Sequence, residues 1–303
     1  MNATIRHLLD RSLRALAPRA PAPPSPQTVA IPRLPPAKEM QDLKRSVLDL
    51  VPENPCLKAY KVFSQNEEDG IIEEILSHVA KNSPPNRRFL EIGCGNGLEN
   101  NSHYLLLKGY RGCWIDGDVG NIDFIRTQLG GLDFAALCVR QHFVDLSNIE
   151  GIIGDTVTFL ETREPDFFSL DIDGNDRWVV EQALRHFEPK VLCVEYNAKF
   201  PPPLSVSIAY CPTHRWAGDD YHGASLQAFC DCLPGYELVS CDLCGVNAFF
   251  VRRDLAIGFP AVGAKSLYQP FREHLTAPRV GHPPTLKWLR DKLMSPGPAF
   301  SGT

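Results

Sequence analysis

The sequence predicts an α/β fold in which helices flank a mostly parallel sheet, and the sheet ends in an antiparallel hairpin strand. Three observations support this prediction. From about residue 60, short apolar runs alternate with segments that have helical spacing. The first of these runs, Phe89–Ile92, leads directly into three glycines at every second position. Near the end of the alternating pattern, two apolar segments flank Leu243-Cys-Gly245, as expected for a hairpin.

The first half of the pattern contains three predicted strands. Ser64-Gln-Asn-Glu67 has the spacing of a capping box and predicts that a helix begins at Glu68. The glycine-rich turn after the first strand allows the backbone to approach a ligand more closely than any Cβ would permit. The expected elements are the helix 68–79, the strand 89–92, the helix 101–108, the strand 112–116, the helix 122–129 and a strand within 135–144 that ends at Asp145.

The second half adds two parallel strands and the hairpin. Between the last parallel strand and the hairpin, the irregular stretch 198–220 is expected to form a lid-like insertion. The expected elements are the helix 148–161, the strand 166–173, the helix 177–186, the strand 190–196, the helix 225–232 and the hairpin strands 236–241 and 247–252.

Composition limits the classes of function. The chain of 303 residues is 44% apolar and 22% charged with a formal net charge of −5, which is typical of a soluble globular protein. The mild acidity argues against general nucleic-acid binding, because such proteins need a basic face to replace phosphate counterions. No run of 18 or more apolar residues is present, so we expect no transmembrane segment. No secretory signal precedes the ten cysteines, several of which lie in predicted buried strands, and we therefore expect a cytoplasmic protein.

The two ends of the chain differ from its middle, and the sequence predicts three regions: 1–40, 41–260 and 261–303. Within the first region, residues 4–17 place apolar side chains at helical spacing with arginines on other faces, and a proline-rich linker follows. Such a basic helix is consistent with peripheral membrane contact, a docking peptide or a cleaved presequence, and equally with a frayed tail or a helix packed on the domain. The last region is expected to be an extension that ends in a disordered tail.

An acid, Glu91, introduces the turn that contains Gly93, Gly95 and Gly97. Dinucleotide-binding folds place the third glycine one residue later, where this chain has Leu98. An acid is also a poor neighbour for a pyrophosphate and a good one for a cation. The turn therefore favours a positively charged ligand.

This turn resembles motif I of class I S-adenosylmethionine-dependent methyltransferases, whose Rossmann-like sheet closes with an antiparallel strand. Phe63-Ser-Gln-x-x-x-Asp69-Gly-Ile-Ile resembles the opening of the FkbM-type family within that class. Asp166–Gly174 and Val191–Glu195 are similar to that family's fourth and fifth strands, although Leu170 stands where the family usually has a lysine. The resemblance covers about residues 60–253. It implies S-adenosylmethionine as cofactor and O-methylation of a small-molecule or carbohydrate acceptor, at a hydroxyl of a sugar or a glycosylated metabolite.

Side chains at the carboxyl edge of the predicted sheet complete a cofactor site. Asp116 ends the second strand about 20 residues after the glycines, where a carboxylate accepts hydrogen bonds from ribose hydroxyls, and Asp118 competes for this role. The resemblance places Asp145 beside the adenine amino group. A single acid at a strand end is explained equally well as a helix N-cap. The predicted cofactor-binding residues are Gln65, Glu91, Gly93, Gly95, Gly97, Asn101, Asp116 and Asp145.

A second group of acids lies at the ends of strands four and five. Asp171 and Asp173 are two residues apart, so both should point to the same face, and Glu195 ends the neighbouring strand. One of these acids acts as general base on the acceptor hydroxyl, or the three together hold Mg²⁺. The third explanation is that Asp171 faces the cofactor while the others cap the next helix. In the following loop, His222 or His214 is a further candidate for the base.

Two other functions and a zinc site remain open. The fold would also serve as a non-catalytic binding or adaptor module, or transfer the methyl group to nitrogen. Cys230, Cys232, Cys241 and Cys244 lie within 15 residues and have features of a zinc knuckle. Against zinc, the first pair spans a predicted helix end and Cys241 lies in a predicted strand.

Overall fold

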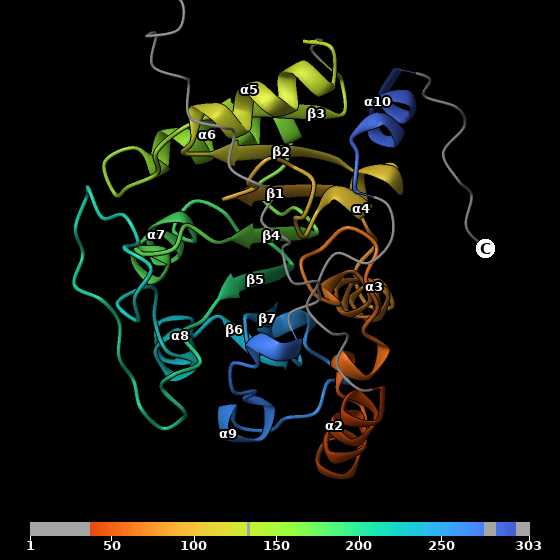
Figure 1. Cartoon of the computed structure of the whole chain (residues 1–303), viewed down its shortest axis with the longest axis vertical. Coiled ribbons are helices and arrows are strands. Elements are labelled where there is room, and N and C mark those ends of the chain that lie inside the picture. Colours follow the sequence, from red (N-terminus) through yellow and green to blue (C-terminus); the bar gives the residue numbers. More distant parts are fainter. Residues whose placement is uncertain (1–36, 132–133, 276–282, 295–303) are drawn as a thin grey trace, which may run out of the picture. The chain divides into compact units, whose positions relative to one another are not determined.

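The structure of the protein, a computed structural model, describes residues 37–131, 134–275 and 283–294 (Figure 1). The predicted amphipathic helix at 4–17, nearly all of the proline-rich linker and the predicted C-terminal tail after residue 294 lie outside the described residues.

Seven strands form one sheet in the order β3-β2-β1-β4-β5-β7-β6, and Figure 1 shows them stacked in this order. The strands are β1 (Arg88–Ile92), β2 (Arg111–Asp116), β3 (Leu137–Gln141), β4 (Phe167–Leu170), β5 (Val191–Glu195), β6 (Tyr236–Cys241) and β7 (Asn247–Arg252). The first five strands pair in parallel, whereas β7 runs antiparallel to both β5 and β6. This arrangement confirms the predicted class I methyltransferase type of sheet.

Helices cover both faces of the sheet. The α-helices are α2 (Ala37–Leu50), α3 (Glu68–Val79), α4 (His103–Leu107), α5 (Val119–Gln128), α6 (Ile149–Leu160), α7 (Asp176–Ala183), α8 (Leu226–Cys232), α9 (Ala264–Leu267) and α10 (Lys287–Met294). Short 3₁₀ helices occur at Pro55–Lys58, Arg253–Leu255 and Glu273–Leu275. Buried side chains of α3, α4, α5 and α10 form a core on one face, and those of α6, α7 and α8 form a core on the other.

The strand order creates the position for a ligand. The chain leaves β1 toward β2 on one side and later returns to β4 on the other side of β1. Because the connections diverge at this point, a crevice opens beyond the carboxyl ends of these strands, where ligands of open α/β sheets bind.

The entry into α3 differs from the predicted capping box. Glu67 precedes the helix but makes no capping hydrogen bond through its side chain. Instead, Ser64 Oγ accepts a hydrogen bond from the backbone N–H of Asp69 (3.1 Å). The Asp69 carboxylate in turn accepts hydrogen bonds from the backbone N–H groups of residues 62–64. The helix begins where predicted, but an acid inside its first turn holds the preceding turn.

Part of the C-terminal extension packs on the sheet domain. Tyr268 Oη donates a hydrogen bond to the carbonyl of Ala198 (2.5 Å), and Leu267 and Leu275 are buried. The helix α10 packs against α4 and buries Leu289.

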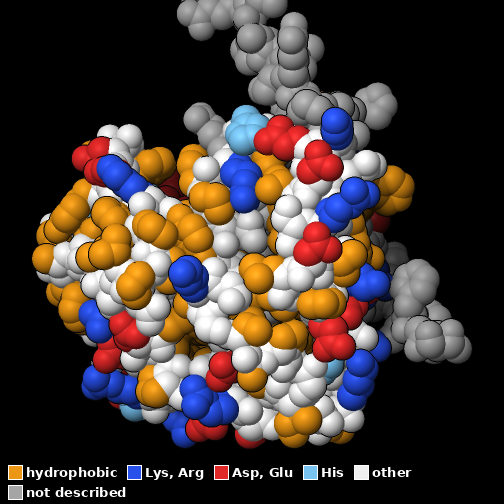
Figure 2. All heavy atoms as spheres, turned by 90° about the horizontal axis from the view of Figure 1, so that it is seen from below, with side chains coloured by type: hydrophobic (Ala, Val, Ile, Leu, Met, Phe, Trp, Pro, Cys, Tyr) orange, Lys and Arg blue, Asp and Glu red, His pale blue; other side chains and the backbone are white. Residues whose placement is uncertain are grey.

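The surface seen from below in Figure 2 mixes hydrophobic side chains with charged groups of both signs. On α2, Leu48 and Leu50 are exposed. Within the described ranges, every helix is too short or too polar to cross a membrane. All ten cysteines are free.

Candidate functional site

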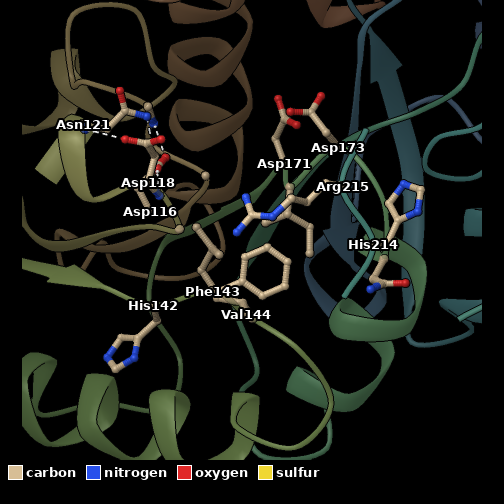
Figure 3. A pocket seen from close by; sticks show the side chains of 16 residues that line it. Asp116, Asp118, Asn121, His142, Phe143, Val144, Asp171, Asp173, His214 and Arg215 are labelled. Atoms are coloured by element: carbon tan, nitrogen blue, oxygen red, sulfur yellow. Dashed lines mark hydrogen bonds between the residues drawn. The ribbon is translucent and has the colours of Figure 1, made fainter. Parts of the chain in front are cut away.

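A cavity of about 330 Å³ opens beyond the carboxyl ends of β1, β2 and β4. Figure 3 shows Asp116, Asp118 and Asn121 together on one side of this cavity, and Asp171 and Asp173 on another. The lining residues with polar, charged or aromatic side chains are Asp116, Asp118, Asn121, His142, Phe143, Asp171, Asp173, Asn175, His214 and Arg215.

The three glycines of the turn after β1 have different tasks. Gly93 has φ +85°, and a Cβ there would lie 1.5 Å from the carbonyl oxygen of Asp171, so this glycine allows the chain ends after β1 and β4 to pack closely. Gly95 has φ +56° and lines the cavity, where a Cβ would meet none of the described atoms within 4 Å. Gly97 has φ +75° and lies against the Trp114 ring, outside the cavity lining. Gly95 is therefore the glycine that leaves room for a ligand.

The structure does not place Glu91 in the cavity. Its carboxylate accepts hydrogen bonds from the backbone N–H groups of Asn101 (2.8 Å) and Ser102 (3.1 Å), and from the Ser102 hydroxyl. Glu91 is buried because it points to the face of the sheet that α3 and α4 cover, and this burial raises its pKa to about 7. The acid that introduces the turn therefore anchors the far end of the turn and does not line the cavity.

Asp116 lies where the sequence predicts it. Its Oδ2 accepts a hydrogen bond from the backbone N–H of Gly95 (2.8 Å), and its Oδ1 accepts from the N–H of Asp118 (2.8 Å) and from Asn121 Nδ2 (3.1 Å). Asp118 Oδ1 accepts from the backbone N–H of Asn121 and so caps α5. Asp116 thus links the glycine turn to the start of α5 at the cavity wall, while the competing acid serves as an N-cap.

Three other predicted cofactor residues lie outside the cavity lining. Asp145 Oδ1 accepts hydrogen bonds from the N–H and hydroxyl of Ser147, which explains it as a turn-forming residue before α6. Asn101 Nδ2 donates to Ser169 Oγ on β4 (3.1 Å). The Gln65 side chain is exposed and does not reach the cavity. These three residues do not line the cavity, and their contact with a cofactor stays a prediction.

The acids after β4 and β5 come together, although not through the predicted extended strand. The strand ends at Leu170, and Asp173 has φ +55°, so Asp171 and Asp173 lie in a loop. Two N–H groups of this loop donate to the buried carboxylate of Asp176, which gives the loop its shape. Nevertheless, one ligand atom from each of Asp171, Asp173 and Glu195 lies within 4.8 Å of the others.

The acid cluster, defined as Asp171, Asp173 and Glu195, holds three carboxyl groups that repel one another when they are ionised. Burial raises the pKa of Asp171, and the negative charge of Glu195 raises it further. Burial likewise raises the pKa of Glu195, with Asp176 and Asp173 adding to the effect. A proton or a cation shared by the cluster therefore relieves repulsion.

The two candidate histidines differ in their surroundings. His222 Nδ1 is 3.8 Å from Glu195 Oε2, and this histidine is not among the residues that line the main cavity. His214 lines the main cavity, and its Nε2 is buried without a hydrogen-bond partner among the described residues. Both positions are compatible with proton transfer, but of the two histidines it is His222 that is paired with a member of the cluster.

Several cavity residues were not predicted from the sequence, among them three that follow β3 and Arg215. His142, Phe143 and Val144 follow β3 and supply much of one wall, and the Arg215 guanidinium lies over the Phe143 ring at 4.7 Å (Figure 3). A signal for Phe143 was available, since an aromatic residue two positions before Asp145 lies at the same strand end. For the loop that contains Arg215, only the two histidines were predicted from the sequence as candidate site residues.

The zinc alternative finds no support in the structure. In the described part of the chain, the acid cluster is the group of potential metal ligands found at suitable distances, and the four cysteines do not form another. Cys230 and Cys232 pack against the core on the α8 side, Cys241 is fully buried on β6, and Cys244 packs in a small separate cluster. The thiols serve as small hydrophobic side chains.

Comparison with known proteins gives similar solved structures that are methyltransferases. An O-methyltransferase from Bacillus cereus in complex with SAH is 16% identical, with 72% of this chain and 92% of that chain covered and a TM-score of 0.39. A TehB-like SAM-dependent methyltransferase from Corynebacterium glutamicum is 16% identical, with coverages of 59% and 87% and a TM-score of 0.33. The glycopeptide N-methyltransferase MtfA is 13% identical, with coverages of 60% and 90% and a TM-score of 0.35. No family model and no curated protein matches the chain.

Proposed function

We propose that the protein is an S-adenosylmethionine-dependent methyltransferase that methylates a hydroxyl of a sugar or a glycosylated metabolite. The observation that carries this proposal is the position of Gly95, which leaves ligand space in a cavity with Asp116 on one wall and two members of the acid cluster on another. The resemblance of the turn to methyltransferase motif I supports the same cofactor.

The charge of the cavity fits S-adenosylmethionine better than a phosphate-bearing cofactor. Among the described residues, the lining contains four carboxylates, those of Asp116, Asp118, Asp171 and Asp173, against one guanidinium, that of Arg215. A pyrophosphate would be repelled there, whereas an ammonium and a sulfonium would be attracted. In this proposal Asp116 receives the ribose hydroxyls, and Phe143 offers an aromatic surface to the adenine ring.

Bound S-adenosylmethionine supplies a methyl group that is already activated, which an acceptor oxygen takes while the sulfonium becomes a thioether. The protein then has two tasks, which are to orient the acceptor and to receive its proton. The acid cluster lies at the cavity edge, and the raised pKa values of Asp171 and Glu195 make these carboxylates stronger bases than usual. The proton of the hydroxyl passes to this cluster or to His222, which is paired with Glu195.

The same cluster would suit Mg²⁺. Carboxylate oxygens are the ligands that this ion prefers, and one or two of them suffice for a site. Bound there, the ion would orient an acceptor hydroxyl and lower its pKa. Asp171→Asn is expected to lower methyl transfer by about 10²-fold or more whether its carboxylate is a base or a ligand. Full activity in EDTA, measured beside the untreated enzyme, would assign the cluster to proton transfer without a metal.

The cofactor assignment is tested by calorimetric titration with S-adenosylhomocysteine, using Asp116→Ala and the control Asp123→Ala. We expect about tenfold or greater loss of affinity for the first variant, because it removes the proposed ribose contact. The control should retain its affinity, because Asp123 is exposed on α5 and does not line the cavity. Equal affinities in the two variants would remove Asp116 from the site. No binding by the wild type, or tighter binding of NAD⁺, would end the cofactor proposal.

A further inference from the structure

A second cavity of about 210 Å³ lies next to the acid cluster, between residues 197–208 and 220–225. Its walls are held together by backbone hydrogen bonds, from Ser225 N to the carbonyl of Val206 (2.8 Å) and from Ile208 N to the carbonyl of Gly223 (3.1 Å). The two segments therefore form a built pocket, and most of its first wall lies in the stretch 198–220 that the sequence predicts as irregular. Its volume is below the range of about 300–1,000 Å³ that holds drug-sized ligands, so it suits a single ring.

This second cavity connects to the proposed site of transfer through His222. The imidazole lines the cavity and lies 3.8 Å from Glu195, whose carboxylate belongs to the acid cluster. Asp171 and Asp173, the other members of the cluster, line the main cavity. A ring seated in the second cavity would therefore lie beside His222, which links it to the carboxylates of the acid cluster.

The walls are largely apolar. Phe200, Val206, Ile208, Tyr221 and Ala224 supply the apolar lining, and the Tyr221 side chain is 53% exposed. An exposed aromatic ring at a cavity mouth is suited to stacking on a flat ligand face.

Several polar groups of the lining are already engaged within the protein. Asn197 Nδ2 donates to the carbonyls of Asp220 (3.0 Å) and His222 (3.1 Å). Ser225 Oγ donates to the carbonyl of Leu204 (2.7 Å) and accepts from the N–H of Val206 (3.1 Å). These groups fix the walls and have little capacity left for a strongly polar ligand.

Among the described residues, the second cavity offers no cation to an anionic ligand. Its lining contains neither lysine nor arginine, and the acid in it is Asp220, while Glu195 lies near His222. Lys199 lies in the sequence between the lining residues Asn197 and Phe200, and it is already paired with Asp220. A phosphate or carboxylate on the ligand would therefore lose hydration without meeting a cation of the described lining.

We propose that the second cavity binds the ring of the methyl acceptor, and that this acceptor is an uncharged, hydroxylated ring without phosphate or carboxylate groups. The proposal rests on the methyltransferase function proposed above and narrows its substrates, because it excludes sugar phosphates, nucleotide sugars and thioesters of coenzyme A. Both a pyranose and a phenol have the required flat apolar face and hydroxyl.

Ligand-observed NMR titration with five probes tests this proposal without requiring turnover. The probes are methyl β-D-glucopyranoside, glucose 6-phosphate, phenol, phenyl phosphate and the cation phenethylamine. We expect each uncharged probe to bind roughly tenfold more tightly than its phosphorylated counterpart, since like charges at a recognition site act against binding. Tighter binding of methyl β-D-glucopyranoside than of phenol would indicate a sugar acceptor, and the reverse order would indicate a phenolic acceptor. Equal or tighter binding of the phosphates would overturn the proposal, as would tighter binding of phenethylamine than of phenol.

Variants place the binding in this cavity. Tyr221→Ala should weaken the uncharged probes about tenfold, whereas Tyr221→Phe should keep their affinity because the ring remains. Val206→Lys adds a cation to the lining and should invert the preference toward the phosphates, whereas the control Leu48→Lys on the exposed face of α2 should change nothing. Unchanged probe binding in both Tyr221→Ala and Val206→Lys would overturn the assignment of the cavity.

Calorimetry with S-adenosylhomocysteine on the same samples separates the two proposals. Normal binding of this compound together with no binding of any probe refutes the acceptor cavity alone. Absence of its binding while the uncharged probes still bind refutes the methyltransferase proposal, and the cavity then remains a neutral-ligand site.

Discussion

Replacement of Gly95 by alanine tests whether the glycine turn serves a ligand or only the fold. At φ +56° an alanine is in the left-handed region, which costs about 1–2 kcal/mol. Because a Cβ at this position meets none of the described atoms within 4 Å, no further steric cost is expected. Gly131, at the end of α5, has φ +65° and equally free surroundings, so Gly131→Ala is the matched control. Both variants should lose about the same stability in thermal or denaturant unfolding.

The two variants should differ only in ligand binding. Gly95 lines the cavity and Gly131 does not, so the added methyl group occupies ligand space in the first variant alone. We expect calorimetry to show about a tenfold or greater loss of S-adenosylhomocysteine affinity for Gly95→Ala, which corresponds to about 1.4 kcal/mol. Wild-type affinity in Gly95→Ala would refute the ligand role of the turn. A much larger stability loss than in Gly131→Ala would show that the open space around Gly95 is needed by the fold.

Two further predictions concern the same turn. Gly93→Ala should unfold at a clearly lower temperature than Gly95→Ala, because its Cβ would lie 1.5 Å from the Asp171 carbonyl oxygen and the backbone must move; equal melting temperatures would contradict the close packing. Burial raises the pKa of Glu91 from 4.5 to about 7 in the folded protein, so its contribution to stability is full below about pH 4.5 and is lost as the pH rises through 7. Denaturant titrations over this window should show a smaller decline for Glu91→Gln than for the wild type, and equal slopes would disprove the burial effect.

The sheet was predictable because its strands are short apolar runs, and their burial does not depend on individual hydrogen bonds or caps. Both hairpin strands were predicted with their observed bounds, 236–241 and 247–252. Several helix ends differ from the predicted ones by one to three residues, since capping depends on individual side chains such as Asp118. The helix α2 and the packed extension with α9 and α10 were not predicted; α2 and α10 are amphipathic, but few of their side chains are buried.

The candidate site was predictable in place but only partly in its residues. Asp116 and the acid cluster follow from the rule that parallel strands bring their carboxyl ends to one edge. The contacts of Glu91 and Asn101 depend instead on which sheet face a side chain takes and which hydrogen-bonding partners lie nearby. The loop of Asp171 and Asp173 was not predicted for a similar reason. The N–H groups of this loop donate to the Asp176 carboxylate instead of continuing the strand, which ends at Leu170.

Strand-end acids in this protein therefore fall into two physical groups. The carboxylates of Asp145 and Asp118 accept hydrogen bonds from backbone N–H groups that follow them in the sequence, as is typical at the start of a turn or a helix. One carboxylate oxygen each of Asp171 and Glu195 lies within 4.8 Å of the other, and burial raises the pKa of both groups, with the charge of neighbouring carboxylates adding to the effect. Because buried acids of like charge cost stability unless they share a proton or a cation, their position at the edge of a ligand-sized cavity supports the proposal that this edge takes part in the chemistry.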